Sequence, residues 1–414
     1  MHLLYLDKHS IYRIITFLFV LTQTLPFINL YIPIRTVWHF PLFLAASFLL
    51  FPNLISRRSV VALFCYIIIA FLFYLSGNPF YDGIGSVTTP LFLMTSGLVM
   101  SEYATKYDYE YKFTRLIVMT VIIANVIMSV ISIPQIIIFP NIIRYTFSVE
   151  YMDNYADLAP WLITYQTCHG LPLLLAPLAF LCRRLFKNNK IKFLFYLSVA
   201  GVLLSIVYLS NATTALLIAI MMVFLAVFFN YEKITRKSLS TILIIGLLGL
   251  IFSSQSVMIP VLNGVQGMMD DRGSNYHKID EIKKGMITGE SEGDLGERKD
   301  LYETSALLFL QSPIVGTTEP EKISNHSWFL DRLACLGLFL IVPLILVFKY
   351  NIKFCMEGLI HTRVVYMYGI MGWFLMLILK NDFDQGSWLY GFAFLPLLCR
   401  YVDYMIDYNQ KQRR

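Results

Sequence analysis

The sequence ISNHSWFLDRLACLGLFLIVPLILVF fills residues 323–348. It ends a long polar segment and passes at once into an apolar run long enough to cross a bilayer, which takes about 20 residues. His326 therefore lies where water would meet the membrane, and Ser324 and Asn325 are good N-cap residues for a helix that begins there. Because His326 and Gly337 are about three helical turns apart, we expect them to share one helix face, which Gly337 leaves open.

A histidine in the first turn of a helix lies at the positive end of the helix dipole. This position disfavours the imidazolium ion and favours a neutral ring that can accept a proton. His326 is thus a candidate general base. The alternative interpretation is an interfacial polar residue that caps a transmembrane helix, which is the commoner role for a lone histidine at such a position.

The composition is that of a polytopic membrane protein. Of 414 residues, 57% are hydrophobic and 14% are charged, which is too apolar for a soluble globular protein. The net charge of +6 needs no nucleic acid to explain it. The six cysteines lie in or beside apolar runs without a CxxC pair, so we expect buried thiols and no disulfide framework. The first apolar run lacks a small-residue cleavage site, which favours a retained helix over a signal peptide.

Apolar runs along the chain predict an all-α fold with about twelve transmembrane helices. They lie at approximately 11–30, 37–55, 59–76, 84–101, 115–139, 162–182, 193–209, 212–230, 239–257, 327–348, 364–380 and 387–405. Lys and Arg are concentrated in every second connection, and basic loops stay in the cytoplasm. We therefore expect a multi-pass membrane protein with both termini cytoplasmic.

One connection is much longer than the others. Residues 258–326 separate the ninth and tenth expected helices, and we expect them to form a large loop on the outer face that contains short helices. Loops of this length are commonly functional. Near its end, apolar residues recur at helical spacing until Pro313 and Gly316. The chain therefore divides into a bundle at 1–257, this loop, and three further transmembrane helices with the tail at 327–414.

Two stretches of this region resemble a known family. His326 and Ser327, followed after nine residues by Gly337, resemble the signature of the O-antigen ligase and polymerase family, which are bacterial membrane glycosyltransferases acting on polyprenyl-diphosphate-linked glycans. The preceding RKDLYETSALLFLQSPIVG, residues 298–316, resembles that family's helix opened by an Arg and ended by Pro-x-x-Gly. The chain departs from the ligase pattern at Leu340, where ligases usually carry Gly, Thr or Tyr.

The resemblance implies a GT-C-like enzyme of the bacterial inner membrane, with the loop at 258–326 in the periplasm. Such an enzyme moves a glycan from a lipid diphosphate to a sugar hydroxyl without a cofactor. His326 would take the hydroxyl proton, and Arg298 would stabilise the leaving diphosphate, for which a guanidinium is well suited. Thr213 stands where a family motif carries an Arg, so that charge would have to come from elsewhere. Further candidate substrate-binding residues are Arg144, Arg272, His169, Arg332, Tyr302 and Trp328.

Each of these candidates also has a structural interpretation. The arginines can be solvated or can snorkel to the interface, and Arg332 can pair with Asp331 or a neighbouring helix. His169 can be a hydrogen-bonded packing residue, while Tyr302 and Trp328 can anchor the membrane boundary.

A metal site has one weak candidate. Asp382 and Asp384 form an Asp-x-Asp pair that could hold a divalent cation. Carboxylates in so short a loop are more often solvated, and we expect no bound metal.

Three functions remain open from the sequence. The first is an O-antigen or exopolysaccharide polymerase, and the second is a ligase that moves the glycan onto lipid A core. The third is a flippase or transporter for lipid-linked sugars, against which stand the single large loop and the lack of two matched halves with broken helices. The expected partners are the polyprenyl-diphosphate-linked donor, an acceptor glycan repeat unit or lipid A core, membrane lipids and a chain-length regulator protein, with no nucleic acid.

Overall fold

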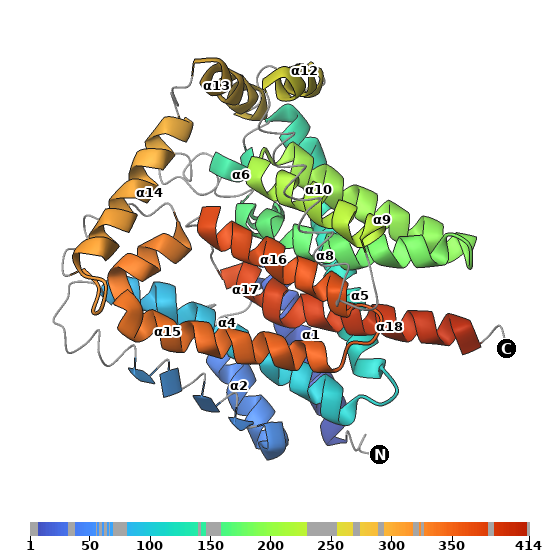
Figure 1. Cartoon of the computed structure of the whole chain (residues 1–414). Helices are drawn as coiled ribbons and strands as arrows, with labels where there is room; N and C mark the ends of the chain where they lie inside the picture. The colour runs from blue at the N-terminus through green and yellow to red at the C-terminus, as the bar shows by residue number, and fades with distance from the viewer. Residues whose placement is uncertain are drawn as a thin grey trace.

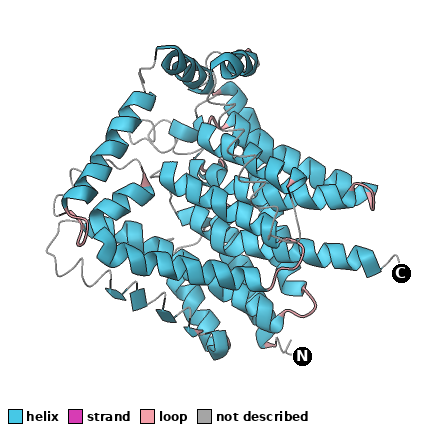
Figure 2. Ribbon diagram, viewed as in Figure 1, coloured by secondary structure: helices cyan, strands magenta, loops and turns pink. Residues whose placement is uncertain are grey.

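The structure is a computed structural model in which the chain forms a bundle of helices (Figure 1). Every secondary-structure element among the described residues is a helix, as Figure 2 shows by colour. The described residues are 7–31, 38–54, 56–57, 60–61, 64–65, 67–68, 81–139, 142–145, 159–229, 255–267, 274–288, 294–317, 323, 327–379 and 385–411.

The helices fall into two groups along the chain. The first group is α1 (Lys8–Thr24), α2 (His39–Leu50), α4 (Tyr81–Tyr107), α5 (Lys112–Ile138), α6 (Ile142–Tyr145), α8 (Tyr165–Leu185), α9 (Lys190–Leu209) and α10 (Thr213–Phe228). The second group is α12 (Gln255–Gln266), α13 (Ser274–Thr288), α14 (Asp294–Gln311), α15 (Trp328–Glu357), α16 (Arg363–Leu379), α17 (Gln385–Leu389) and α18 (Leu395–Lys411). A π-helical segment, Tyr390–Phe394, joins α17 to α18.

Five helices of the described chain are long and apolar enough to cross a membrane. They are α5, α8, α9, α15 and the continuous helical stretch Ser387–Asn409. The prediction of an all-helical fold is therefore confirmed among the described residues, and the five long apolar helices support a multi-pass membrane protein. Most of each of the expected spans at 239–257 and 59–76 lies outside the described residues, so the count of twelve stays a prediction.

Basic side chains from distant parts of the chain gather at one end of the bundle. We call this the basic end and define it by Lys8, Lys106, Lys192 and Arg400. Lys106 donates to the backbone carbonyl of Asn53 at 2.7 Å, and Arg400 donates to the hydroxyl of Thr105 at 3.1 Å. Lys192 lies 5.4 Å from the ring centroid of Tyr408. Both chain termini lie toward this end, at the lower right of Figure 1.

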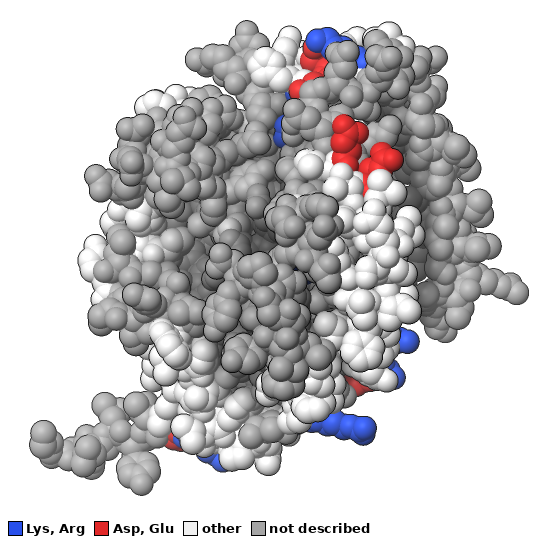
Figure 3. Space-filling view, turned by 90° about the vertical axis from the view of Figure 1, so that its left-hand side faces the viewer, with Lys and Arg blue, Asp and Glu red and all other residues white. Residues whose placement is uncertain are grey.

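The opposite side of the molecule carries α12, α13 and α14. Figure 3 looks onto this side and shows charged side chains in its upper part, at the height of α12 to α14, and along its lower margin. The described residues between these two zones are uncharged in this view.

α8 forms the centre of the bundle, where it contacts α9, α10, α16 and α18. Its residue Gly170 lies against the ring of Tyr390, and a Cβ atom there would be 2.6 Å from a ring carbon. The Tyr390 hydroxyl continues past α8 and donates to Oδ1 of Asn125 on α5 at 2.6 Å, fully buried. A glycine on α8 thus allows the π-helical segment to reach α5.

α15 is broken about a third of the way along its length. Gly337 has φ +58° and ψ −177°, a conformation that essentially only glycine adopts. The expectation that Gly337 lies on one face of a continuous helix and leaves that face open is wrong. The neighbouring chain at residues 314–316 fills the space beside it. The expected lack of two matched halves with broken helices stays a prediction, since this break is in a single helix.

Candidate functional site

The N-terminus of α15 is closed by its own side chains. Ser327 is the N-cap, because its hydroxyl accepts from the amide of Leu330 at 3.2 Å. The carboxylate of Asp331 reaches back and accepts from the amide of Ser327 at 3.1 Å. This reciprocal arrangement resembles a capping box. The expectation that Ser324 or Asn325 caps this helix is therefore wrong, and α15 begins two residues after His326.

The same carboxylate joins α15 to α14. The hydroxyl of Ser305 on α14 donates to Asp331 Oδ1 at 2.6 Å, and both side chains are completely buried. Beside this bond, Leu308 of α14 packs in a small apolar cluster with Ile323 and Ala334. A buried charge is tolerated only where hydrogen bonds replace its hydration, so Asp331 holds the two helices in one register.

Backbone hydrogen bonds join the break in α15 to the turn that follows α14. The amides of Leu338 and Phe339 donate to the carbonyls of Pro313 and Ile314 at 2.8 Å and 3.0 Å. In return, the amide of Thr317 donates to the carbonyl of Ala334 at 2.8 Å. Three backbone groups beside the break are therefore paired with the neighbouring turn, as a buried helix interruption requires.

Two glycines make this close approach possible. Gly316 has φ +83°, and a side chain on it would overlap the backbone of Cys335. A side chain on Gly337 would overlap the backbone of Ile314. We call the assembly of Ser305, Pro313, Gly316, Asp331 and Gly337 the α14–α15 junction. The helix expected at the end of the long loop is confirmed as α14, with Pro313 and Gly316 following it.

Arg332 is the candidate arginine that the structure describes best. Its side chain is only 7% exposed, and its Nε atom is buried without a hydrogen-bond partner in the described part of the molecule. Within that part no ion pair joins it to Asp331, which is engaged by Ser305 and Ser327. Of the two expected partners of Arg332, Asp331 is not in an ion pair with it among the described contacts, and a partner on a neighbouring helix stays a prediction. A buried guanidinium beside the break in α15 is a potential anion contact.

Four other candidates lie where their side chains are not described. His326 and Arg272 fall outside the described residues. Arg298 lies in the first half of α14 and Arg144 lies in α6, but the structure describes only the backbone of these two residues. The roles of these four residues stay predictions, since no contact or distance between their side chains is described.

The aromatic candidates are engaged in packing. Tyr302 on α14 donates its hydroxyl to the carbonyl of Leu379 at 3.0 Å. Trp328 is 3% exposed, and its ring centroid lies 5.2 Å from that of Trp388. Tyr302 thus joins α14 to α16 through its hydroxyl, and the Trp328 ring packs α15 against α17.

His169 lies inside the bundle rather than at the α14–α15 junction. It is 2% exposed, its Nδ1 lies 2.9 Å from the carbonyl of Tyr165, and its ring meets the Tyr165 ring edge to face at 4.6 Å between centroids. Its neighbour Gly170 packs on Tyr390. This environment is that of a hydrogen-bonded core histidine.

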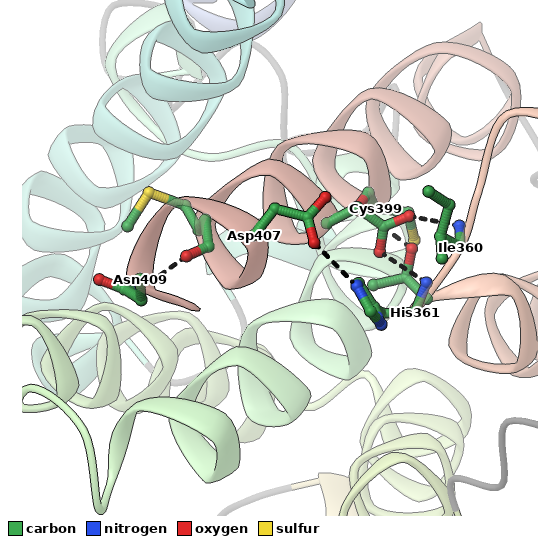
Figure 4. Close-up of polar contacts among 8 residues, drawn as sticks. Ile360, His361, Cys399, Asp407 and Asn409 are labelled. Atoms are coloured by element: carbon green, nitrogen blue, oxygen red, sulfur yellow. Dashed lines mark hydrogen bonds and ion pairs between the residues drawn. The ribbon is translucent and has the colours of Figure 1, made fainter. Parts of the chain in front are cut away.

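Sequence reasoning missed a polar cluster at the basic end (Figure 4). The Asp403 carboxylate on α18 accepts from the amides of Ile360 and His361 at 2.6 Å and 3.2 Å. One turn further along α18, Asp407 Oδ1 lies 3.0 Å from His361 Nε2. The signal was an Asp-x-x-x-Asp pair on the last helix, spaced to lie on one face. The cluster fastens the α15–α16 turn to α18, which is a structural role.

Neither metal-binding groups nor known relatives assign a chemistry to this chain. Among the described residues no three His, Cys, Asp or Glu side chains gather as a metal would require, and the Asp382 and Asp384 pair lies outside them. No family model matches the sequence, and no curated protein matches it either. The functional argument therefore depends on the α14–α15 junction and on the sequence motif within it.

Proposed function

We propose that this protein is a membrane glycosyltransferase that polymerises O-antigen or exopolysaccharide repeat units carried on a polyprenyl diphosphate. The α14–α15 junction is the observation that supports the proposal. It interlocks the two stretches that carry the family resemblance, because Pro313 and Gly316 from the first meet Gly337 from the second. The two stretches that resemble the family, 298–316 and 326–337, are both needed to build this junction, which gives a physical reason for their occurrence in one chain.

The proposed reaction needs a base, a cation and a lipid-level acceptor site. His326 removes the proton from the acceptor hydroxyl, whose oxygen then bonds to the anomeric carbon of the donor glycan. The bond from that carbon to the diphosphate breaks, and the electron pair leaves with the lipid diphosphate. Arg298 and Arg332 lie on the two helices of the junction, and Arg144 or Arg272 is a further source of charge for the leaving group.

We further propose that the basic end faces the cytoplasm and that the α14–α15 junction faces the periplasm of a bacterial inner membrane. The gathering of Lys and Arg at one end supports this orientation, since basic loops are retained on the cytoplasmic side. Both termini are then cytoplasmic. The catalytic groups lie on the side where no nucleotide is available, and the donor's own diphosphate bond drives the transfer.

The test is complementation of a deletion strain with His326→Ala, read by electrophoresis of the surface glycan. His277→Ala is the matched control, because His277 is an exposed histidine on α13 in the same large loop. We expect His326→Ala to give single repeat units on the acceptor and His277→Ala to restore the full ladder. Lipid-linked polymer without any glycan on lipid A core would instead mean a ligase. An unaltered ladder with His326→Ala would contradict both enzymes.

The break in α15 gives a lipid-linked sugar transporter some support as a second candidate. Broken helices with paired backbone ends form substrate sites in transporters, and Gly337 creates such a break. Binding separates the two classes. An enzyme with His326→Ala still binds the lipid-linked donor but transfers nothing, whereas a transporter with this substitution keeps moving its substrate across proteoliposomes.

A further inference from the structure

A second surface feature lies at the basic end and does not depend on the proposed reaction. A cavity of about 470 Å³ opens between α5, α9 and α18. We call it the tyrosine cup. Its lining is Arg115, Met119, Ile191, Lys192, Phe195 and the side chains Tyr196, Tyr401, Tyr404, Met405 and Tyr408. The described lining contains two cations and no carboxylate.

The acidic residues of α18 point to a different side of that helix. Asp403 and Asp407 bind the turn at residues 360–361, as Figure 4 shows. Tyr401 and Tyr408, by contrast, line the cup at a seven-residue spacing, which puts them on one face. α18 thus turns its carboxylates away from the cup and leaves the positive charge of the cup uncompensated.

The floor of the cup offers a hydrogen-bond donor. The hydroxyl oxygens of Tyr196 and Tyr401 lie 2.7 Å apart in a buried position. Each hydroxyl carries one proton, and the bond between them uses one of the two. The second proton is left to donate to a ligand. The described lining thus offers two cations and a hydroxyl donor, and it contains no carboxylate. Such a site favours an anion with several oxygens, such as a phosphate.

An apolar groove continues from the cup along the lipid-facing side of α5. It has a volume of about 590 Å³ and is lined mostly by apolar side chains of α1 and α5, such as Phe17, Leu21 and Ile123. Arg115 and Met119 line both the cup and the groove, so the two are adjacent. Lys112 and Arg115 lie at the first turn of α5, at the basic end of the groove. The cationic cup therefore lies beside the apolar groove, just as the phosphate headgroup of a phospholipid adjoins its acyl chains.

We propose that the tyrosine cup and this groove bind one anionic phospholipid from the membrane leaflet at the basic end. The phosphate lies in the cup between Arg115, Lys192 and the Tyr196–Tyr401 pair, and an acyl chain fills the groove on α5. A bound lipid would join α1, α5, α9 and α18, four elements that meet at the basic end.

The test compares two lipids that differ only in the headgroup. Full-length protein in detergent is titrated with palmitoyl-oleoyl phosphatidylglycerol and with palmitoyl-oleoyl phosphatidylcholine, and bound lipid is counted by native mass spectrometry. We expect one phosphatidylglycerol to bind more tightly than phosphatidylcholine. Arg115→Gln with Lys192→Gln should weaken phosphatidylglycerol binding about 10- to 30-fold, since each basic residue near anionic lipid contributes about 1 kcal/mol.

A charge-matched control removes two other lysines at the same end. Lys349 and Lys353 are exposed on α15 and do not line the described cup or groove. Lys349→Gln with Lys353→Gln should leave the specific binding unchanged. An equal loss in this control, or equal affinity for the two lipids, would overturn the proposal.

Two further variants separate the headgroup from the acyl chain. Tyr196→Phe with Tyr401→Phe keeps the rings, removes the floor donor and should lower phosphatidylglycerol affinity several-fold. Ile123→Trp should fill the groove and displace the lipid, whereas Leu217→Trp, at an equally exposed position on α10, should not. Competition by soluble glycerol phosphate as strong as by the lipid would show an anion site without a lipid and would also overturn the proposal.

Discussion

The hydroxyl of Ser305 on α14 donates to the carboxylate of Asp331 on α15 at 2.6 Å, in a position from which water is excluded. The other oxygen of the same carboxylate accepts from the amide of Ser327 and so closes the N-terminus of α15. One side chain thus caps a helix and fastens it to its neighbour. The helix that follows the candidate base is positioned by this contact.

Ser305→Ala should destabilise the protein by about 1–3 kcal/mol, because the buried Asp331 carboxylate loses one of its hydrogen bonds. Thermal unfolding in detergent measures the effect. Thr304→Ala is the control, since the Thr304 hydroxyl bonds only the carbonyl of Asp300 one turn earlier on the same exposed helix surface. Equal stability of the two variants would mean that the Ser305 bond contributes nothing.

Gly337→Ala should destabilise the protein by at least about 2 kcal/mol. The added methyl group overlaps the backbone of Ile314, and the backbone angles at Gly337 are ones that alanine rarely adopts. Gly201→Ala on α9 provides the contrast, because among the described residues no atom beyond its own stretch of helix lies within 4 Å of the Cβ it would add. That variant should be neutral or slightly stabilising, since alanine favours a helix over glycine. If the two variants unfolded at the same temperature, the break in α15 at Gly337 would be refuted.

Tyr390→Phe should cost about 1–3 kcal/mol, because it leaves the buried Oδ1 of Asn125 without the donor that it has now. The ring itself stays in place against Gly170, so the loss reports the hydrogen bond rather than packing. Tyr109→Phe, at a position 83% exposed, should leave unfolding unchanged. A Tyr390→Phe variant as stable as this control would argue that the bond makes no net contribution.

The first turn of α1 should lose protection in acid. The Asp7 side chain caps α1 by accepting from the amide of Ser10 at 2.6 Å, and this bond holds the pKa of the carboxyl below its usual value. A group whose pKa is lowered by folding stabilises the folded state above its unfolded pKa, about 3.9. That contribution is lost as the pH falls through the lowered pKa. Hydrogen-exchange protection of the Ser10 amide should therefore fall below about pH 4.

Asp7→Asn isolates the titration in that experiment. Asparagine is as good an N-cap as aspartate, but it carries no titrating charge. The Asn variant should keep its protection at low pH. A protection profile that falls in the same way for both proteins would show that another group causes the acid sensitivity.

The helical architecture could be predicted because it depends on local sequence. Apolar runs of bilayer length predicted the long helices, and helical spacing before Pro313 and Gly316 predicted α14. The break at Gly337 could not be predicted in this way. It depends on the arrival of residues 313–317 from another element, whose backbone replaces hydrogen bonds that α15 would otherwise make within itself.

The contacts of the candidate site were harder to predict from the sequence, because they also depend on residues from another helix. Ser324 and Asn325 have good capping chemistry, but Ser327 caps α15 because Asp331 stands four residues later and completes the reciprocal bond. Arg332 could be expected to pair with that carboxylate by proximity in sequence. The carboxylate is already occupied by Ser305 from α14, a partner that only the tertiary structure supplies.

The turn at residues 313–317 also has a consequence for biogenesis. It precedes α15 along the chain, so the ribosome releases the interrupting segment before the helix that it interrupts. Chains fold from their N-terminal side as they emerge. The two ends of the broken helix can therefore meet waiting hydrogen-bond partners during membrane insertion, and a circular permutant that reversed this order would have to insert α15 with unpaired amides.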